Sequence, residues 1–540
     1  MKCYPIPEPL RDYLERLHDE AVRLEDLLHV VRRNAAPMTE EEWRESLAYF
    51  RGRCRQAKEE LQAAKETVAE LYEKEIGGED WKILFDRCVL AVGEGALPPV
   101  STRRESFGDR LRRLYPPDDP KPLTMGSDYP KDVTIQVTDR CNMACTYCYQ
   151  QNKGTHSMDF DTAKEFLNLL LAGDGRTEGY LDPNTCQGII LNFIGGEPWL
   201  EIDLIHQVSD YFIAELFRLK HPWATKFCFS VCSNGLLHFD PRVQDYLKRH
   251  GKHLSYNVSV DGDKTLHDSC RVDLAGDGTY NRAMAAVEDY RSTFGGEMGS
   301  KMTLAPQNIH HLARALKHMI GQAGYRNIQL NCVYEEGWDT DHACTLYAQL
   351  KEVTDWLGEE GLLEEVYLSM LDPLCGHPLD GTDDRNWCGG AGLMLAVDWK
   401  GDLYPCLRYM ESSLGGSREP YTIGTVAEGI GCDHKSCQRL DCLRKITRSS
   451  QSEQACLDCP IASGCGWCSA YNYQCFGTPD RRATYICKMH RARTLACAYY
   501  FGKRGIPYAL DCPQSWGEEL IGKAEFEILK GGMAHGSGTG

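Results

Sequence analysis

The chain lacks the features that would mark a membrane, secreted or nucleic-acid-binding protein. No apolar run approaches the ~20 residues needed to span a bilayer, so no membrane partner is expected. The N-terminus, MKCYPIPEPLRDYLERLHDE, contains no apolar segment of the kind found in a secretion signal, and we expect a cytoplasmic protein. Basic residues are outnumbered, with 60 Lys and Arg against 78 Asp and Glu, which argues against a general nucleic-acid partner.

Cysteine, in contrast, is abundant, with 26 residues in 540. A large disulfide framework would not persist in a reducing compartment, so the cysteines indicate metal, cluster or redox chemistry. Their distribution is uneven, because 13 of the 26 lie between Cys375 and Cys497. Scattered cysteines elsewhere are expected to be buried core residues.

The first part of the chain, residues 1–125, is predicted to be an N-terminal helical region with an antiparallel hairpin over 8–75. Apolar residues follow an unbroken 4-3-4-3 spacing over 10–31 and again over 43–71, which is the pattern of a coiled-coil seam. The hairpin is expected to serve packing or dimerisation. Docking of a peptide or another partner is the alternative.

After a proline-rich linker, short β-rich runs alternate with amphipathic helical stretches. This alternation over 126–370 predicts an α/β core with a parallel sheet, open or barrel-like, whose chemistry lies at the carboxyl ends of the strands. Residues 371–512 are rich in Gly, Cys and turns and are expected to need metal to fold, and 513–540 reads as a tail with a short helix. The predicted strands are 133–137, 188–194, 226–232, 254–260, 302–305 and 328–333.

A compact cysteine motif, Cys141-Asn-Met-Ala-Cys145-Thr-Tyr-Cys148, directly follows the first predicted strand. Three thiolates in one short loop can bind one face of an iron–sulfur cube and leave its fourth iron without a protein ligand. An iron without a protein ligand can chelate a substrate, which distinguishes a catalytic cluster from an electron carrier.

Polar turns follow the next three strands. Any one of them could be an ordinary turn, but turns at successive strand ends meet at one edge of a parallel sheet and define one site. The first turn carries a carboxylate suited to the ammonium group of a ligand. The three turns are Gly195-Gly196-Glu197-Pro198, Ser233-Asn234-Gly235 and Ser259-Val260-Asp261-Gly262.

These motifs together resemble those of radical S-adenosylmethionine (SAM) enzymes over residues 128–335. The resemblance implies a partial (β/α)6 barrel, a [4Fe–4S] cluster on Cys141, Cys145 and Cys148, and reductive cleavage of SAM to a 5′-deoxyadenosyl radical. Arg271 is implied as a carboxylate partner, and an ion-paired surface arginine is the alternative. The other implied SAM contacts are Tyr147 near the adenine, Gly195, Gly196 and Glu197 at the ammonium, and Ser233, Asn234, Ser259 and Asp261 near the ribose or carboxylate.

A second group of cysteines centres on Cys456-Leu-Asp-Cys459-Pro-Ile-Ala-Ser-Gly-Cys465-Gly-Trp-Cys468. Read alone, this group fits either a zinc ribbon or iron–sulfur ligation. Beside the first motif it resembles the SPASM extension of radical SAM peptide-modifying enzymes, with CxxC in place of CxxxC at Cys465–Cys468. The resemblance implies two auxiliary [4Fe–4S] clusters. One would be held by Cys388, Cys406 and Cys468 with Cys375 as candidate fourth ligand, and the other by Cys456, Cys459, Cys465 and Cys487.

Two points about these cysteines stay open. If Cys375 does not bind, the first auxiliary cluster has an open iron that could capture a substrate thiolate. The remaining cysteines of this region are structural, alternative cluster ligands or redox-active thiols. They are Cys432, Cys437, Cys442 and Cys475.

The resemblance implies a maturase of a ribosomally synthesised (RiPP) precursor peptide with a leader, served by a low-potential electron donor such as flavodoxin or ferredoxin. A net oxidation would form a thioether, ether or C–C crosslink, and epimerisation stays open. The first alternative is an anaerobic sulfatase-maturating enzyme. Such enzymes carry an Asp directly after the cysteine of a GxxxxC element, which in this chain runs from Gly401 to Cys406 and is followed by Leu407. Another base could substitute there, among Asp372, Asp398 and Glu335. The non-enzyme alternative is a zinc or iron–sulfur scaffold or electron-transfer protein.

Overall fold

The computed structural model divides the chain into two compact units. The first comprises Met1–Tyr129, Pro183–Gly188 and His206–Phe227, and the second comprises Pro130–Asp182, Ile189–Ile205 and Cys228–Gly540. The structure describes residues 2–7, 9–11, 13–15, 17–18, 21, 40–84, 89–93, 131–150, 153–173, 175–177, 180–181, 188–219, 221–224, 226–295, 298–335, 337–372, 388–391, 394–461, 465–506, 508 and 512–534.

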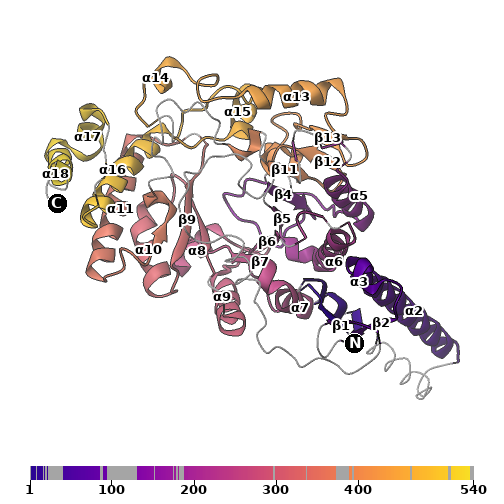
Figure 1. The fold of residues 1–540 in the computed structure, drawn as a ribbon. Helices are drawn as coiled ribbons and strands as arrows, with labels where there is room; N and C mark the ends of the chain where they lie inside the picture. The colour runs from indigo at the N-terminus through magenta and orange to yellow at the C-terminus, as the bar shows by residue number, and fades with distance from the viewer. Residues whose placement is uncertain are drawn as a thin grey trace. The chain divides into compact units, whose positions relative to one another are not determined.

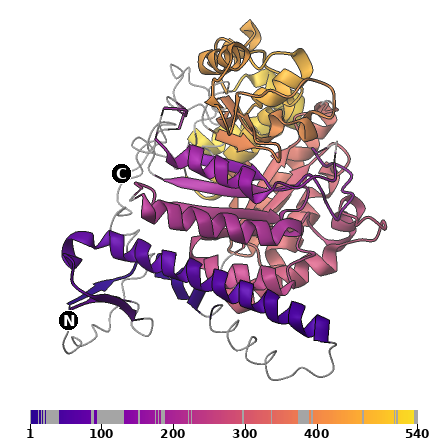
Figure 2. The same cartoon turned by 90° about the vertical axis from the view of Figure 1, so that its right-hand side faces the viewer.

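The first unit contains a long helix, α2 (Glu40–Leu71), which Figure 2 shows as one unbroken element. Its predicted seam is buried at Cys54, Ala57, Leu61, Ala64 and Val68. The described residues from 9 to 21 are helical as well, whereas 22–39, where the predicted hairpin would turn, lie outside the described residues. The antiparallel pairing of the two helices therefore stays a prediction.

A three-stranded antiparallel sheet in this unit has no counterpart in the sequence-based expectation. Its order is β1-β3-β2, so that β3 pairs with both neighbours. Tyr72, after α2, donates a hydrogen bond through its hydroxyl to the Pro5 carbonyl at 2.5 Å, tying the helix to the sheet. The elements are β1 (Lys2–Pro5), α3 (Glu73–Ile76), β2 (Trp81–Leu84) and β3 (Val89–Val92).

In the second unit all six predicted strands are present within a few residues of their expected bounds, with the first four in one sheet and the last two in another (Figure 1). Strands β4 and β5, β6 and β7, and β8 and β9 pair in parallel. The strands are β4 (Lys131–Gln136), β5 (Ile189–Ile194), β6 (Phe227–Ser233), β7 (Leu254–Val258), β8 (Ser300–Leu304) and β9 (Asn327–Cys332).

Fully buried and less buried residues alternate along β5, β6, β8 and β9, as the two-residue repeat of a strand predicts, whereas the last four residues of β4 are all buried. Helices connect consecutive strands, so the mixed α/β fold is confirmed. Closure into a partial (β/α)6 barrel stays a prediction, because β7 and β8 belong to different sheets. The helices are α5 (Phe160–Leu171), α6 (Ile202–Arg218), α7 (Pro241–His250), α8 (Lys264–Cys270), α9 (Tyr280–Phe294), α10 (Leu312–Gly321) and α11 (Thr340–Glu359).

The cysteine-rich region continues the same sheet. Strand β11 pairs in parallel with β4, with Met394 opposite Asp132, and β12, β13 and β14 follow in antiparallel order. Its strands are β11 (Met394–Val397), β12 (Asp402–Tyr404), β13 (Gly424–Thr425) and β14 (Gly429–Ile430), whereas β10 (Tyr367–Leu368) precedes this region and pairs in parallel with β9 in the other sheet. Its helices, including two in the predicted tail, are α12 (Glu411–Leu414), α13 (His434–Lys445), α14 (Gln454–Leu457), α15 (Ser469–Phe476), α16 (Cys487–Lys503), α17 (Gln514–Ile521) and α18 (Lys523–Ala534).

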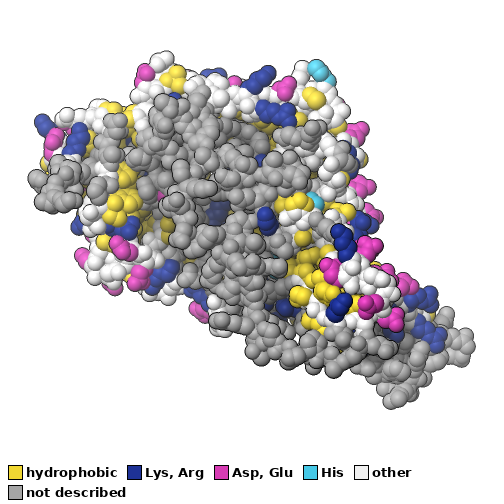
Figure 3. All heavy atoms as spheres, in the orientation of Figure 1, with side chains coloured by type: hydrophobic (Ala, Val, Ile, Leu, Met, Phe, Trp, Pro, Cys, Tyr) yellow, Lys and Arg dark blue, Asp and Glu magenta, His cyan; other side chains and the backbone are white. Residues whose placement is uncertain are grey.

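Two surface findings bear on partners. None of the described helices is long and apolar enough to cross a membrane. On the face seen in Figure 3, the coloured Lys and Arg side chains are interspersed with Asp and Glu.

Candidate functional site

The loop that carries the first cysteine motif is fixed by the segment that follows α8. The Ala144 amide donates to the Val272 carbonyl at 2.8 Å, and the Thr146 amide donates to the Cys270 carbonyl at 2.9 Å. The Lys153 ammonium donates to the Met143 carbonyl at 2.9 Å. The loop therefore has a defined path although it contains no helix or strand.

The glycine turn after β5 packs against the backbone of this cysteine loop. The Glu197 amide donates to the Arg140 carbonyl at 2.9 Å. A Cβ atom on Gly196 would lie 2.2 Å from the Arg140 carbonyl oxygen and 2.6 Å from Cys141 Cβ, and one on Gly195 would lie 2.7 Å from a carbonyl oxygen. Only glycine fits at both positions without moving the loop.

The Glu197 carboxylate connects the ends of β5 and β6. It is 1% exposed and accepts hydrogen bonds from Ser233 Oγ at 2.7 Å, the Asn234 amide at 2.8 Å and the Trp199 amide at 3.2 Å. Burial raises its pKa to about 7, even though these hydrogen bonds act to lower it. Asn234 Nδ2 also donates to Asn142 Oδ1 at 2.7 Å, which joins the second turn to the cysteine loop.

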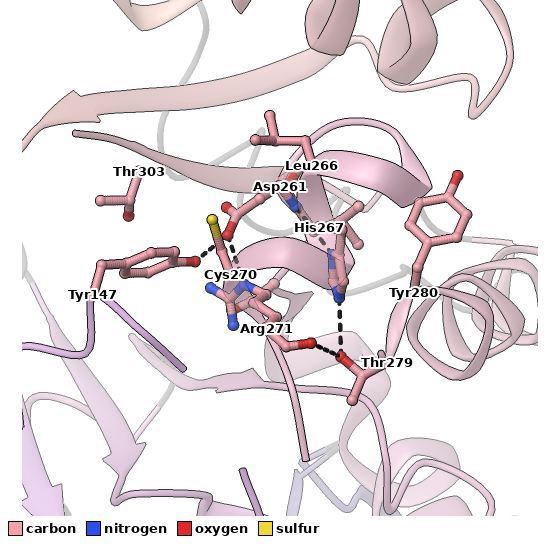
Figure 4. A network of polar contacts seen from close by, with 12 residues as sticks. Tyr147, Asp261, Leu266, His267, Cys270, Arg271, Thr279, Tyr280 and Thr303 are labelled. Carbon is pink, nitrogen blue, oxygen red and sulfur yellow. Dashed lines mark hydrogen bonds and ion pairs between the residues drawn. The ribbon is translucent and has the colours of Figure 1, made fainter. Parts of the chain in front are cut away.

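A buried network gathers three more of the predicted residues (Figure 4). Asp261 Oδ2 accepts hydrogen bonds from the Tyr147 hydroxyl and, at 2.8 Å, from Arg271 Nε. The Arg271 guanidinium lies 5.5 Å from the centroid of the Tyr147 ring. The Arg271 side chain is 12% exposed, so the arginine is ion-paired but largely buried. Asp261 Oδ1 is buried and has no hydrogen-bond partner among the described residues.

Two residues that the sequence analysis did not select hold this network in place. His267 Nε2 lies 3.0 Å from Thr279 Oγ1, and that hydroxyl donates to the Arg271 carbonyl at 3.0 Å. Burial lowers the His267 pKa to about 4. The last predicted contact, Ser259, extends the β6–β7 pairing through its amide, which donates to the Ser233 carbonyl at 2.9 Å.

In the cysteine-rich region, one group of thiols comprises Cys388, Cys406 and Cys468. Burial raises the pKa of the Cys406 thiol, and the neighbouring Cys468 and Cys388 thiols raise it further. Cys388 Sγ lies 3.2 Å from Ser469 Oγ, and the Tyr471 amide donates to Cys468 Sγ at 3.4 Å.

A second group comprises the other four predicted thiols. Burial raises the pKa of Cys487 to about 12, and Cys465 and Cys456 add to this effect. The pKa of Cys459 is raised by burial and by the same two neighbours, while a backbone hydrogen bond acts to lower it. The electrostatic neighbours of these thiols thus fall into two groups, and the assignment of the groups to two clusters stays a prediction.

Three findings complete the picture of the cysteines. Cys375 lies outside the described residues. Among the residues that the structure describes, no three or more His, Cys, Asp or Glu side chains form a single metal-ion site. Of the unassigned cysteines, Cys432 and Cys437 are exposed.

One cluster of side chains lies between the two cysteine regions and was not predicted as a group. Tyr149 keeps 36% of its surface exposed, yet desolvation by the surrounding protein raises its pKa, and both Cys148 and Cys406 raise it further, so this tyrosine neighbours both regions. The Arg408 guanidinium lies 5.7 Å from the Tyr149 ring centroid and pairs with Glu335 Oε1 at 3.1 Å.

The three carboxylates named as substitute bases differ in their surroundings. Glu335 belongs to the cluster beside Tyr149 and is 44% exposed. Asp398 is 4% exposed and accepts hydrogen bonds from the Lys400 and Asp402 amides and the Tyr404 hydroxyl. Its carboxylate therefore stabilises the turn between β11 and β12. Asp372 accepts a hydrogen bond from the Tyr367 hydroxyl at 2.7 Å. Only Glu335 is therefore shown beside the cysteine loop.

Comparison with known proteins gives one relative with a named activity and one that is uncharacterised. No protein-family model matches the chain. The mycofactocin maturase MftC of Mycolicibacterium smegmatis is 23% identical over 362 residues, which cover 64% of this chain and 80% of MftC. An uncharacterised protein of Methanocaldococcus jannaschii is 40% identical over 81 residues, or 15% of this chain, and the match spans only 24% of that protein's length.

Among solved structures, anSMEcpe with bound AdoMet and the peptide Kp18Cys is 18% identical with a TM-score of 0.52, covering 69% of this chain and 98% of that one. The chain is thus similar to radical SAM enzymes that modify peptides. The predicted resemblance and the predicted class of enzyme are confirmed.

Proposed function

We propose that this chain is a radical SAM maturase that oxidatively modifies a ribosomally synthesised precursor peptide. The observation that carries the proposal is the fixed position of the cysteine loop. Gly196 packs against Cys141, and the segment after α8 holds the other side of the loop. Cys141, Cys145 and Cys148 would ligate a [4Fe–4S] cluster there, because thiolates are the usual protein ligands of such clusters.

The residues around the loop fit SAM. The unpartnered Asp261 Oδ1 supplies a buried acceptor, while its other oxygen holds Tyr147 and Arg271 in place. When bound, the cluster and SAM supply a 5′-deoxyadenosyl radical that abstracts a substrate hydrogen. The buried network and the glycine turn would orient the ligand and limit access of water to it.

Two auxiliary [4Fe–4S] clusters are part of the proposal. The two groups of thiols support them, with Cys388, Cys406 and Cys468 in one group and the remaining four in the other. A net oxidation requires the substrate to lose an electron as the new bond forms. Tyr149, which neighbours both Cys148 and Cys406, marks the region in which a substrate could approach both cysteine regions.

The proposed substrate is a precursor peptide with a leader, and the proposed product contains a thioether, ether or C–C crosslink. Support comes from MftC, which is named a maturase, and from anSMEcpe, which was solved with a peptide. Sulfatase-type oxidation is less favoured, because Leu407 follows Cys406 and the next residue, Arg408, is cationic. A flavodoxin or ferredoxin would supply the electron for SAM cleavage, and residues 1–125 are a candidate docking region for the leader.

The test is anaerobic iron and sulfide analysis with a SAM-cleavage assay. Wild-type protein should contain roughly twelve irons and form 5′-deoxyadenosine, and a Cys141/Cys145/Cys148 triple alanine variant should contain about four fewer irons and form none. A Cys432→Ala/Cys437→Ala double variant is the matched control and should behave as wild type. Protein that binds no iron after reconstitution and cleaves no SAM would contradict the proposal and favour a zinc-organised scaffold.

A peptide encoded beside the gene provides the substrate test. Coexpression with the enzyme should remove two hydrogens from the peptide for each crosslink formed, as measured by mass spectrometry. Conversion of a Cys or Ser of a neighbouring sulfatase to formylglycine would instead support the sulfatase-type reaction.

A further inference from the structure

The first group of cysteine-region thiols is surrounded by hydrogen-bond donors that point at sulfur. Ser469, at the start of α15, is fully buried, and its hydroxyl lies 3.2 Å from Cys388 Sγ while its amide donates to the same sulfur at 3.5 Å. A Cβ atom on Gly390 would lie 3.0 Å from Cys406 Sγ and 3.4 Å from Ser469 Oγ. The hydroxyl and the two thiols therefore line one small space.

Tyr409 directs a second hydroxyl to this space. The residue ends the short 3-10 turn η6 (Leu407–Tyr409), and its amide donates to the Cys406 carbonyl at 3.1 Å. Its ring packs against Tyr421, with centroids 4.9 Å apart, and against Tyr473 at 6.1 Å, so its direction is fixed. The side chain lies within electrostatic reach of Cys388, Cys406 and Cys468 and near Ser469.

This tyrosine hydroxyl is anomalous because it is buried and no acceptor among the described residues lies within hydrogen-bond distance, although the Ser469 hydroxyl is close enough to lower its pKa. A buried donor without an acceptor destabilises the folded state, and such groups are rare in folded proteins. An acceptor in the space between the thiols would remove that cost. Sulfide and thiolate sulfur atoms of a bound cluster are acceptors of this kind.

We infer that Tyr409 and Ser469 donate hydrogen bonds to the sulfur atoms of a cluster bound by Cys388, Cys406 and Cys468, and thereby set its reduction potential. The inference rests on the proposed function. Hydrogen bonds to cluster sulfur stabilise the reduced state, which carries more negative charge, and so raise the potential. The cluster nearest Tyr149 and Arg408 is thereby made easier to reduce than it would be without these donors, which suits it to receive the electron that the substrate loses.

The experiment is an anaerobic redox titration followed by electron paramagnetic resonance, with iron content measured on each sample. A Cys388→Ala variant identifies the signal of the cluster in question. Tyr409→Phe and Ser469→Ala should each shift the midpoint of that signal to a more negative potential and leave the other midpoints unchanged, whereas Ser469→Thr, which keeps the hydroxyl, should restore most of the wild-type value.

Tyr325→Phe is the matched control, since Tyr325 is also buried with an unpartnered hydroxyl but lies against Arg291, 4.5 Å from its ring centroid. It should shift no midpoint. A Tyr409→Phe protein with wild-type iron content and unchanged midpoints would overturn the inference and leave the proposed function intact. Wild-type protein with no iron–sulfur signal at all would overturn the proposed function itself.

Discussion

Replacing Gly196 by alanine should separate the cysteine loop from the strand end that supports it. The added Cβ would lie 2.2 Å from the Arg140 carbonyl oxygen and 2.6 Å from Cys141 Cβ, and both contacts are with backbone or with the first atom of a side chain. Neither neighbour can move away by a rotamer change. The loop backbone itself must therefore shift.

The cost follows from two contributions. Overpacking in a filled site typically costs about 1–3 kcal/mol. Displacing the Arg140 carbonyl also weakens the 2.9 Å hydrogen bond that it accepts from the Glu197 amide, which adds about 1 kcal/mol. We therefore expect a loss of about 2–4 kcal/mol in the free energy of unfolding, together with loss of the iron bound by the Cys141 loop.

Gly251→Ala provides the control, because a Cβ atom there meets nothing within 4 Å and the backbone φ of −50° suits alanine. Both variants are compared by denaturant unfolding and by iron content after anaerobic reconstitution. A Gly196→Ala protein with wild-type stability and iron content would refute the close-packing argument, as would equal damage from the control substitution.

Three further expectations concern charge and metal. Burial raises the pKa of Asp132 from 3.8 to about 6, so between these pH values the unfolded chain releases a proton that the folded chain keeps. The free energy of unfolding should therefore fall by up to about 3 kcal/mol as the pH rises through this range, and Asp132→Asn should flatten the fall in a pH series of unfolding curves. Arg271→Leu leaves the buried Asp261 carboxylate without its cation and should lower the free energy of unfolding by about 3–5 kcal/mol. Adding Asp261→Asn to this variant should recover a part of the loss. Strictly additive losses in denaturant unfolding would contradict the buried ion pair. Anaerobic chelation of iron should speed proteolysis within residues 388–487, and an unchanged cleavage rate in limited proteolysis would show that this region folds without metal.

The core sheet was predictable because its signals are local. The strands from β4 to β9 are short β-rich runs bounded by turn residues, and in β9 the alternation of polar and apolar residues directly predicts the burial of every second side chain. The motifs at the strand ends were predictable for the same reason. Parallel strands bring their carboxyl ends to one edge, so chain order alone groups Glu197, Ser233 and Asp261.

What the sequence did not indicate depends on contacts between distant segments. The strands β1, β2 and β3 have only four residues each, too few for periodicity to identify. The cluster of Tyr149, Arg408 and Glu335 joins three segments that no spacing rule connects. The role of Tyr409 likewise becomes visible only once its hydroxyl is found buried and unpartnered.

The parallel pairing of β11 with β4 has a consequence for how the protein is made. These two strands are about 260 residues apart in the chain, so β4 leaves the ribosome long before its second neighbour is synthesised. Until then one edge of β4 is open and can pair with other chains. Correct assembly must wait for the cysteine-rich segment. Slow translation or added chaperones, together with an adequate iron supply, should therefore raise the yield of soluble protein. Deletion of the cysteine-rich segment should yield aggregates rather than an isolated core.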